Sequence, residues 1–161
     1  MTEALADPLR PHEETVALPG GFDAGLWFIG RIRTPWASRS DCPKRGDAEA
    51  GPPCRIEVDP RWTLALDGIG KHENLQVLYW MHLSRRDAVR QNPAFADRSI
   101  GTFAIRSPLR PNPVASSVVR LLAVEGNILT VRGLDCVDGT PLIDLKPEFG
   151  ALWCNTSQQK R

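Results

Sequence analysis

The hydrophobic pattern of the chain consists of short apolar runs that end at glycine and proline residues. Such runs, rich in β-branched and aromatic residues, are typical of strands, and few segments show the 3.6-residue spacing of an amphipathic helix. We expect strands at residues 26–32, 55–58, 75–83, 100–105, 118–124 and 128–131. Residues 62–69 fit a strand or a helical turn. The pattern predicts a mainly β fold, a small closed or partly closed β-barrel with long loops and little helix, because closure removes exposed sheet edges.

The run LQVLYWMHL at residues 75–83 is apolar almost throughout. A run of this kind predicts a central strand buried on both faces. His82 lies near its end, where a histidine is more often a hydrogen-bonded core or rim residue than a catalyst. Farther along the chain, Gly126-Asn127 stands between two apolar runs, and this tight-turn signal predicts a hairpin of residues 118–124 and 128–131.

Composition limits the possible classes of protein. The chain has 161 residues and a formal net charge of +1, which suits one domain and gives no overall attraction to nucleic acid or membranes. Its four cysteines form no CxxC pair, which argues against a zinc site, and no metal is expected. Without an apolar run of membrane-spanning length or a signal-peptide pattern, a cytoplasmic protein with reduced thiols and no membrane partner is expected. We expect a flexible arm at residues 1–25, a barrel domain at 26–150 and a polar tail at 151–161.

Two long polar segments interrupt the predicted strands. Residues 37–53, ASRSDCPKRGDAEAGPP, are too rich in Gly and Pro for a regular element, and loops of this length are often functional or disordered. Asp41, Lys44 and Arg45 are candidates for ligand contact, although a solvated mobile loop fits the composition as well. Residues 84–98 are expected to form the second long loop.

The segment GTFAIRSPLRPNP at residues 101–113 combines the end of a predicted strand with Arg106, Arg110 and three prolines. Proline fixes its own φ and restricts the preceding residue, so the loop would hold both guanidinium groups at little further cost in chain entropy. The pattern favours a preorganised cationic loop. A rigid turn with two solvated arginines is the alternative.

The segment DCVDGTPLIDLKP at residues 135–147 contains Asp135, Asp138 and Asp144. Three carboxylates in ten positions are compatible with a divalent cation, but their spacing does not fit an EF-hand. Asp135 or Asp138 is alternatively an acceptor for a ligand's hydroxyl or amine, or satisfies backbone donors in its own turn. Rossmann, P-loop and nucleophile-elbow motifs are absent from the sequence.

Five motifs together resemble the TsaA-like family, also called TrmO or YaeB. They are IGRIRTPW at residues 29–36, Cys42-Pro43-Lys44, LYWMH at 78–82, and the segments at 101–113 and 134–147. The family is known as S-adenosylmethionine-dependent tRNA methyltransferases that act on threonylcarbamoyl-modified adenosine beside the anticodon. The resemblance implies a small β-barrel that forms a homodimer, with the cofactor near the subunit interface.

Carried over motif by motif, the resemblance implies a set of cofactor contacts: Pro43, Lys44, Arg45, His82, Leu83, Arg106, Ser116, Asp135, Cys136, Val137 and Asp138. Asp135 and His82 are the candidate catalytic bases. Arg33 and Arg110 are candidates for contact with the tRNA substrate. Carboxylates suit the ribose hydroxyl and amino groups of the cofactor, and an arginine suits its carboxylate.

Two departures from the family pattern bear on these expectations. The RPNP motif is followed by Val114-Ala115 in place of Ile-Gly, and longer bacterial members carry an additional C-terminal domain. A non-catalytic module that binds S-adenosylmethionine or a nucleotide, and a small-molecule methyltransferase of the same fold, are therefore the alternatives.

Overall fold

A computed structural model describes residues 8–149 of the chain and divides into two units. The larger, here called the barrel unit, contains Trp27–Tyr79 and the described residues from Ser116 onward. The smaller, here called the small-sheet unit, contains the described residues up to Leu26 together with Trp80–Ala115. The tail predicted at residues 151–161 lies outside the described residues, as do residues 1–7 of the predicted arm.

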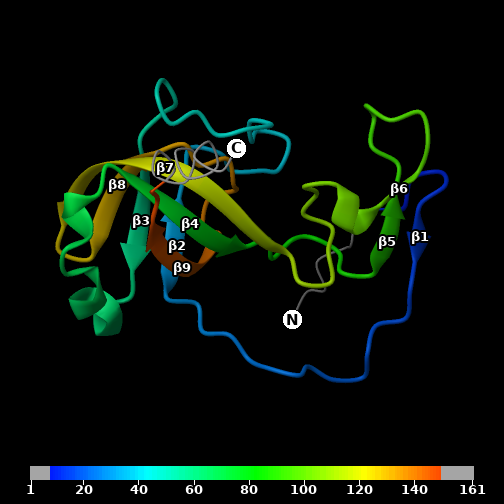
Figure 1. The fold of residues 1–161 in the computed structure, drawn as a ribbon, viewed down its shortest axis with the longest axis horizontal. Coiled ribbons are helices and arrows are strands. Elements are labelled where there is room, and N and C mark those ends of the chain that lie inside the picture. Colours follow the sequence, from blue (N-terminus) through cyan, green and yellow to red (C-terminus); the bar gives the residue numbers. More distant parts are fainter. Residues whose placement is uncertain (1–7, 150–161) are drawn as a thin grey trace, which may run out of the picture. The chain divides into compact units, whose positions relative to one another are not determined.

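The barrel unit is built on a closed six-stranded β-barrel (Figure 1). Around the barrel the strands follow the order β2-β3-β8-β7-β4-β9. Their bounds are β2 Gly30–Arg33, β3 Cys54–Val58, β4 Asn74–Trp80, β7 Val114–Glu125, β8 Ile128–Arg132 and β9 Pro141–Pro147. The prediction of a mainly β fold with a closed barrel is confirmed.

The barrel encloses an apolar core because its strands alternate inward and outward side chains. In β4, Leu75, Val77 and Tyr79 are buried and the residues between them are half-buried. The prediction that residues 75–83 are buried on both faces is wrong, because a barrel strand has only one face toward the core. The strand also ends at Trp80, after which the backbone N–H of Met81 donates to Pro113 O over 2.8 Å.

The first barrel strand begins later than its apolar pattern predicts. Trp27 is 80% exposed and Leu26 is 54% exposed, so the prediction of a strand from residue 26 is wrong. The ladder starts at Gly30, which is opposite Val58 of β3 and Leu142 of β9. A Cβ at Gly30 would overlap the carbonyl oxygen of Glu57, so this close approach requires glycine. The position of the partner strands, rather than apolarity, therefore decides where β2 begins.

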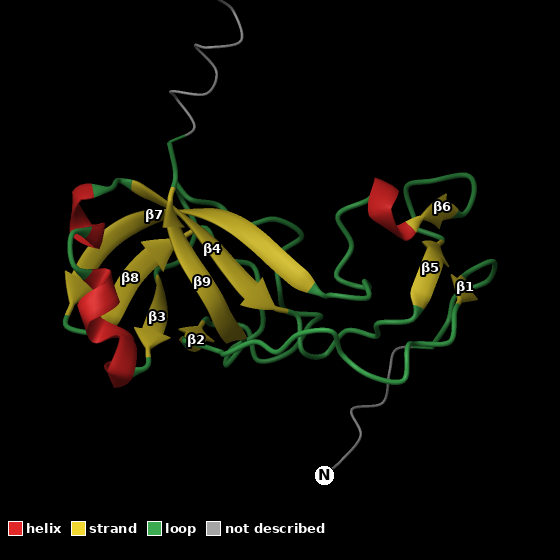
Figure 2. Ribbon diagram, turned by 60° about the horizontal axis from the view of Figure 1, so that its bottom comes forward, coloured by secondary structure: helices red, strands yellow, loops and turns green. Residues whose placement is uncertain are grey.

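The turns between barrel strands follow local sequence signals. The predicted hairpin is confirmed as β7 and β8, with Gly126 at φ 62° in the turn. The undecided segment is helical: η1 (Pro60–Leu66) and η2 (Ile69–Lys71) are 3-10 helices, among the few helical segments in Figure 2. Asp59 begins η1 by accepting a hydrogen bond from the backbone N–H of Arg61. No helix in the described part of the chain is long and apolar enough to cross a membrane.

The small-sheet unit carries three short strands in the order β1-β5-β6: β1 Glu14–Thr15, β5 Ala88–Gln91 and β6 Ile100–Gly101. The sequence predicts neither β1 nor β5, and the prediction that residues 84–98 are all loop is wrong. The strand predicted at 100–105 ends at Gly101, and η3 (Thr102–Ala104) follows it with Phe103 78% exposed. Polar contacts hold this sheet, so hydrophobic patterning does not reveal it.

Candidate functional site

Four predicted cofactor contacts of the barrel unit lie in the turn between β8 and β9, namely Asp135, Cys136, Val137 and Asp138. Asp135 is half-buried there and accepts a hydrogen bond at Oδ1 from the hydroxyl of Tyr79, over 2.7 Å. Tyr79 Oη also lies 2.8 Å from Ser117 Oγ. Asp135 therefore uses one carboxylate oxygen to accept from a side chain of β4, a partner that the sequence did not indicate.

The side chain of Asp138, in the same turn, contacts the end of β2 and not β4. Its Oδ1 accepts the backbone N–H of Thr34 over 3.1 Å, and its Oδ2 lies 3.6 Å from Nη1 of Arg33. The Thr34 hydroxyl donates to Cys136 O over 2.8 Å. The side chain of Asp138 therefore fastens the turn to the end of β2, whereas Asp135 reaches into the barrel.

Gly139 and Thr140 complete the turn that presents Asp135. Gly139 has φ 79°, a conformation that favours glycine, and its N–H donates to Ile32 O over 2.8 Å. The Thr140 hydroxyl donates to Val137 O over 2.6 Å. With these bonds at both ends, the turn is built from its own sequence and from β2, which gives Asp135 a fixed backbone.

The loop of residues 37–53 packs onto the strand that leads into this turn. A Cβ at Gly46 would overlap the carbonyl of Gly133, so the two backbones are in close contact. Asp47 accepts hydrogen bonds from the backbone N–H groups of Glu49 and Ala50 over 2.9 and 2.8 Å. These side-chain hydrogen bonds satisfy backbone N–H groups of a loop that has no regular secondary structure. The predicted ligand contacts Pro43, Lys44 and Arg45 are exposed on this loop.

Cysteine thiols near the turn are in their protonated form. Burial, and secondarily the charge of Asp135, raises the pKa of the half-buried Cys42 thiol, which places that thiol within the electrostatic reach of Asp135. Burial raises the pKa of Cys136 to about 12 and that of Cys54 to about 11. The whole Cys136 residue, backbone and side chain together, is only 1% exposed, so it offers almost no surface for the predicted cofactor contact. No group of three His, Cys, Asp or Glu side chains in residues 8–149 is arranged to hold a metal ion.

Ser116, the remaining predicted contact in the barrel unit, lies on β7 beside Ser117. Its Oγ accepts a hydrogen bond from Gln76 Nε2 over 3.0 Å. Tyr79, Ser117 and Gln76 are polar groups on the barrel strands that sequence reasoning did not single out. The available signal was the single tyrosine of the chain, placed in an otherwise apolar run.

The other predicted residues belong to the small-sheet unit. His82 and Leu83 follow β4 directly and are both exposed, and Arg106 is exposed in the loop after η3. Arg110 donates through Nη1 to Ile105 O over 2.7 Å, and its guanidinium lies over the ring of Phe103. Arg110 therefore holds the shape of the loop that displays Arg106.

Two neighbouring arginines are also internal to this unit. Arg85 Nε donates to Asp87 Oδ1 over 2.7 Å, and Arg86 donates to Pro111 O over 2.5 Å. The Arg86 guanidinium is 5.3 Å from the ring centre of Trp80. These groups stabilise the unit, and Arg106 is exposed in the predicted cationic loop.

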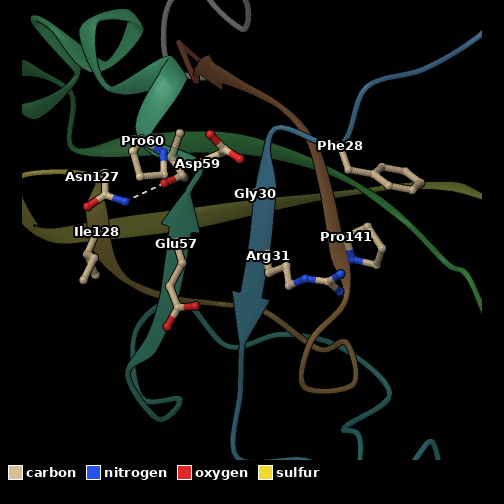
Figure 3. Close-up of a pocket in the computed structure, with 10 residues that line it drawn as sticks. Phe28, Gly30, Arg31, Glu57, Asp59, Pro60, Asn127, Ile128 and Pro141 are labelled. Carbon is tan, nitrogen blue, oxygen red and sulfur yellow. Dashed lines mark hydrogen bonds between the residues drawn. The ribbon is translucent and has the colours of Figure 1, made fainter.

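A separate open groove of about 470 Å³ lies on the barrel, lined from β2, β3, β8 and β9 by residues that include Arg31, Glu57, Ile128 and Pro141 (Figure 3). Its polar groups bind within the protein: Asn127 Nδ2 donates to Val58 O over 2.6 Å, and Arg31 donates to Gly139 O over 3.2 Å. None of the predicted site residues lines it. The groove is therefore distinct from the candidate site at Asp135.

Residues 31–152 match the family model of the tRNA-methyltransferase O N-terminal domain. The chain belongs to this family. Family membership confirms the resemblance found in the five sequence motifs, and the match includes the turn at 135–140.

Two curated relatives have names that refer to S-adenosylmethionine binding. "Probable S-adenosyl-L-methionine-binding protein VirR" of Rhizobium radiobacter is 50% identical over 140 residues, which cover 87% of this chain and 79% of VirR. A "Probable S-adenosyl-L-methionine-binding protein" of Methanothermobacter thermautotrophicus is 40% identical over 121 residues, 75% of this chain and 87% of that protein.

The crystal structure of TrmO from Pseudomonas aeruginosa is similar in fold, with a TM-score of 0.65 and 29% identity. The similarity covers 81% of this chain and 58% of the TrmO chain. The chain thus spans somewhat more than half the length of that solved structure.

Proposed function

We propose that this protein is an S-adenosylmethionine-dependent methyltransferase whose acceptor is the threonylcarbamoyl-modified adenosine next to the tRNA anticodon. The observation that carries the proposal is the Asp135 turn, a half-buried carboxylate on a fixed backbone within a TrmO-family barrel. The names of the relatives support the cofactor, and the name of the family supports methyl transfer to tRNA.

The side chains of the turn and of the neighbouring loop fit this cofactor chemically. Asp135 has a carboxylate oxygen, Oδ2, without a hydrogen bond to any residue between 8 and 149, and it would accept one from a ribose hydroxyl or the amino group of the cofactor. Lys44, Arg45 and Arg106 are exposed cations that suit the cofactor carboxylate. The other proposed contacts, carried over from the family resemblance, are Pro43, His82, Leu83, Ser116, Cys136 and Val137.

When bound, S-adenosylmethionine supplies a methyl group activated by the sulfonium charge. The protein's part in such an in-line displacement is mainly to position the acceptor nitrogen and to exclude water. Because a urea-like nitrogen is a poor nucleophile, Asp135 or His82 is proposed to receive its proton. Either group would act from a surface that the acceptor can reach, since Asp135 is half-buried and His82 is exposed.

Support for tRNA as the acceptor comes from the family and not from an evident basic face. Arg33 pairs with Glu57 at 2.9 Å, and Arg85 and Arg86 are used within the small-sheet unit. The proposed RNA contacts of Arg33 and Arg110 would add to these internal roles. The slope of tRNA affinity against salt concentration reports how many phosphates the protein neutralises. Measuring this slope for variants of Arg33 and Arg110 would test the proposed RNA contacts.

We also propose that the protein acts as a homodimer. The family resemblance suggests it, and large exposed apolar side chains such as Trp27 and Phe22, 80% and 81% exposed, provide surface that a partner would cover. Light scattering after size-exclusion chromatography would give the mass in solution, and a monomer at all concentrations would refute this assembly.

Two measurements test the main proposal. Calorimetric titration with S-adenosylmethionine should give saturable binding, and the lack of any binding at millimolar cofactor would refute it. Incubation with labelled cofactor and tRNA from a strain lacking the family enzyme should transfer the methyl group to the modified adenosine.

A non-catalytic S-adenosylmethionine-binding protein is the second candidate function. It is favoured by the names of the relatives at 50% and 40% identity, which specify binding and not transfer. Saturable cofactor binding without transfer to tRNA or to small molecules would identify this function.

A further inference from the structure

Tyr79 is the only tyrosine of the chain and has no role in the proposed function so far. Its side chain is inside the barrel unit and 3% exposed. The hydroxyl lies between two polar groups, 2.7 Å from Asp135 Oδ1 and 2.8 Å from Ser117 Oγ. A buried hydroxyl in an apolar barrel is costly unless it is paired, so the surrounding structure holds this group in place.

The direction of these hydrogen bonds follows from proton counting. A phenol has one proton, and an ionised carboxylate only accepts, so Tyr79 donates to Asp135. The Ser117 hydroxyl must then donate to the Tyr79 oxygen. Burial, and next the charge of Asp135, raises the pKa of Tyr79 far above its usual range, so the phenol keeps its proton at physiological pH. The result is a directed chain from Ser117 through Tyr79 to Asp135.

This chain fixes one oxygen of Asp135 and leaves the other available. Oδ1 of the carboxylate accepts the hydrogen bond from the Tyr79 hydroxyl. Because hydrogen bonds to a charged acceptor are stronger than neutral ones, this bond restricts rotation of the carboxylate. Oδ2 has no such bond to residues 8–149. A carboxylate held in this way needs no reordering when it meets a cationic or hydroxyl group of a ligand, and preorganisation of this kind increases affinity.

We propose that Tyr79 is a positioning residue that orients Asp135 toward the ribose hydroxyl or amino group of S-adenosylmethionine, with Ser117 as its support. The inference rests on the proposed function, since it assigns Asp135 to the cofactor. It also makes a claim about the protein without cofactor, namely that Tyr79 and Asp135 are directly coupled.

The coupling is tested first without cofactor. Because the chain has one tyrosine, the near-ultraviolet absorbance of tyrosinate reports Tyr79 alone. Asp135→Asn, which keeps the side-chain volume, should let Tyr79 ionise at lower pH than in the wild type, because the carboxylate no longer opposes the phenolate. The neighbouring Cys136 also opposes ionisation, so Cys136→Ser is measured in parallel. Thermal unfolding at neutral pH gives a second measure, in which Tyr79→Phe and Asp135→Asn should have non-additive effects on stability. Full additivity together with an unchanged titration would overturn the coupling.

The second test is a double-mutant cycle on cofactor binding by calorimetry. Tyr79→Phe keeps the ring and removes the hydroxyl, and should weaken binding about tenfold, with Ser117→Ala weakening it about threefold. In an Asp135→Ala background, Tyr79→Phe should have no further effect, because there is no carboxylate left to orient. Thr63→Val, which deletes a hydroxyl bonded to Pro60 O in η1, is the matched control and should bind as the wild type does.

The outcomes separate the two proposals. If the wild type binds the cofactor and Tyr79→Phe binds it equally well, the positioning role is overturned. It is also overturned if Tyr79→Phe lowers the affinity by the same factor with and without Asp135. No binding by the wild type, with the titration shift still present, would refute the proposed function and the assignment of Asp135 to the cofactor while leaving the Tyr79–Asp135 bond established. Thermal unfolding of each variant distinguishes a lost site from a lost fold.

Discussion

The two units of this protein are stabilised in different ways. The barrel unit has an apolar core in which Ile32, Ile56, Leu129 and Leu142 are fully buried. The small-sheet unit depends on polar groups, with the buried amide of Gln91 donating to both Thr102 Oγ1 and Leu109 O. Apolar burial tolerates some change of shape, whereas a buried polar group needs its particular partner. The comparison indicates that the cost of a substitution in the barrel core depends on the apolar volume removed. In the small sheet it depends on which hydrogen-bond partner is lost.

The largest effect is expected from Leu142→Ala in the barrel. Leu142 is fully buried, and its truncation should lower the free energy of unfolding by about 2–5 kcal/mol through lost burial and the cavity left behind. Chemical denaturation monitored by tryptophan fluorescence measures the change. Leu64→Ala at a position 91% exposed is the control and should stay within about 0.5 kcal/mol of the wild type.

An intermediate effect is expected from Gln91→Leu in the small sheet. Loss of the amide donor leaves Leu109 O without its partner, at a cost of about 1–3 kcal/mol. Hydrogen exchange should show faster opening of β5 with the barrel strands unchanged. Thr102→Val breaks the same network, so the two substitutions combined should cost less than their sum, and full additivity would contradict a shared network.

A smaller and pH-dependent effect is expected at Asp87. Its hydrogen bond with Arg85 holds the pKa of the carboxyl below its usual value, so the ionised form stabilises the fold. This contribution is present above the unfolded-state pKa of about 3.9 and is lost as the pH falls through the lower folded-state value. Asp87→Asn should therefore destabilise the protein by up to about 1 kcal/mol at pH near 7, with a gap that closes in strong acid. A gap that persists there would indicate lost packing and not lost charge.

The smallest effect is expected from Arg120→Ala on the barrel surface. Arg120 lies 3.1 Å from Glu49 and 3.4 Å from Glu73, but all three side chains are well exposed. Exposed pairs contribute about 0–1 kcal/mol, and salt screens them. The unfolding midpoints of the wild type and the variant should differ slightly at low salt and converge at high salt. A large loss that salt does not reduce would show that the barrel, too, depends on particular polar partners.

The motifs predict which segments form the candidate site, and this stays a prediction. They do not predict which partners the side chains of these segments have. The turn at Asp135 and the loop at Lys44 were expected to act together, and the thiol of Cys42 in that loop is within the electrostatic reach of Asp135. The sequence does not distinguish Asp135 from Asp138, since both are aspartates in one turn. Only the strand register brings Tyr79 to the first and Thr34 to the second. The partner of a polar side chain that is distant along the chain is a tertiary property.

The sequence by itself determined the mainly β fold, the hairpin at Gly126 and the family, because turn residues, alternating apolar positions and short motifs act locally. The tertiary structure alone decided that β2 begins at Gly30, since that depends on where β3 and β9 lie. It also decided that Arg110 holds its own loop and that β5 is a strand at all. The physical reason is the same in each case: hydrophobic periodicity records which face of a segment is buried, but not which distant group will satisfy a polar one.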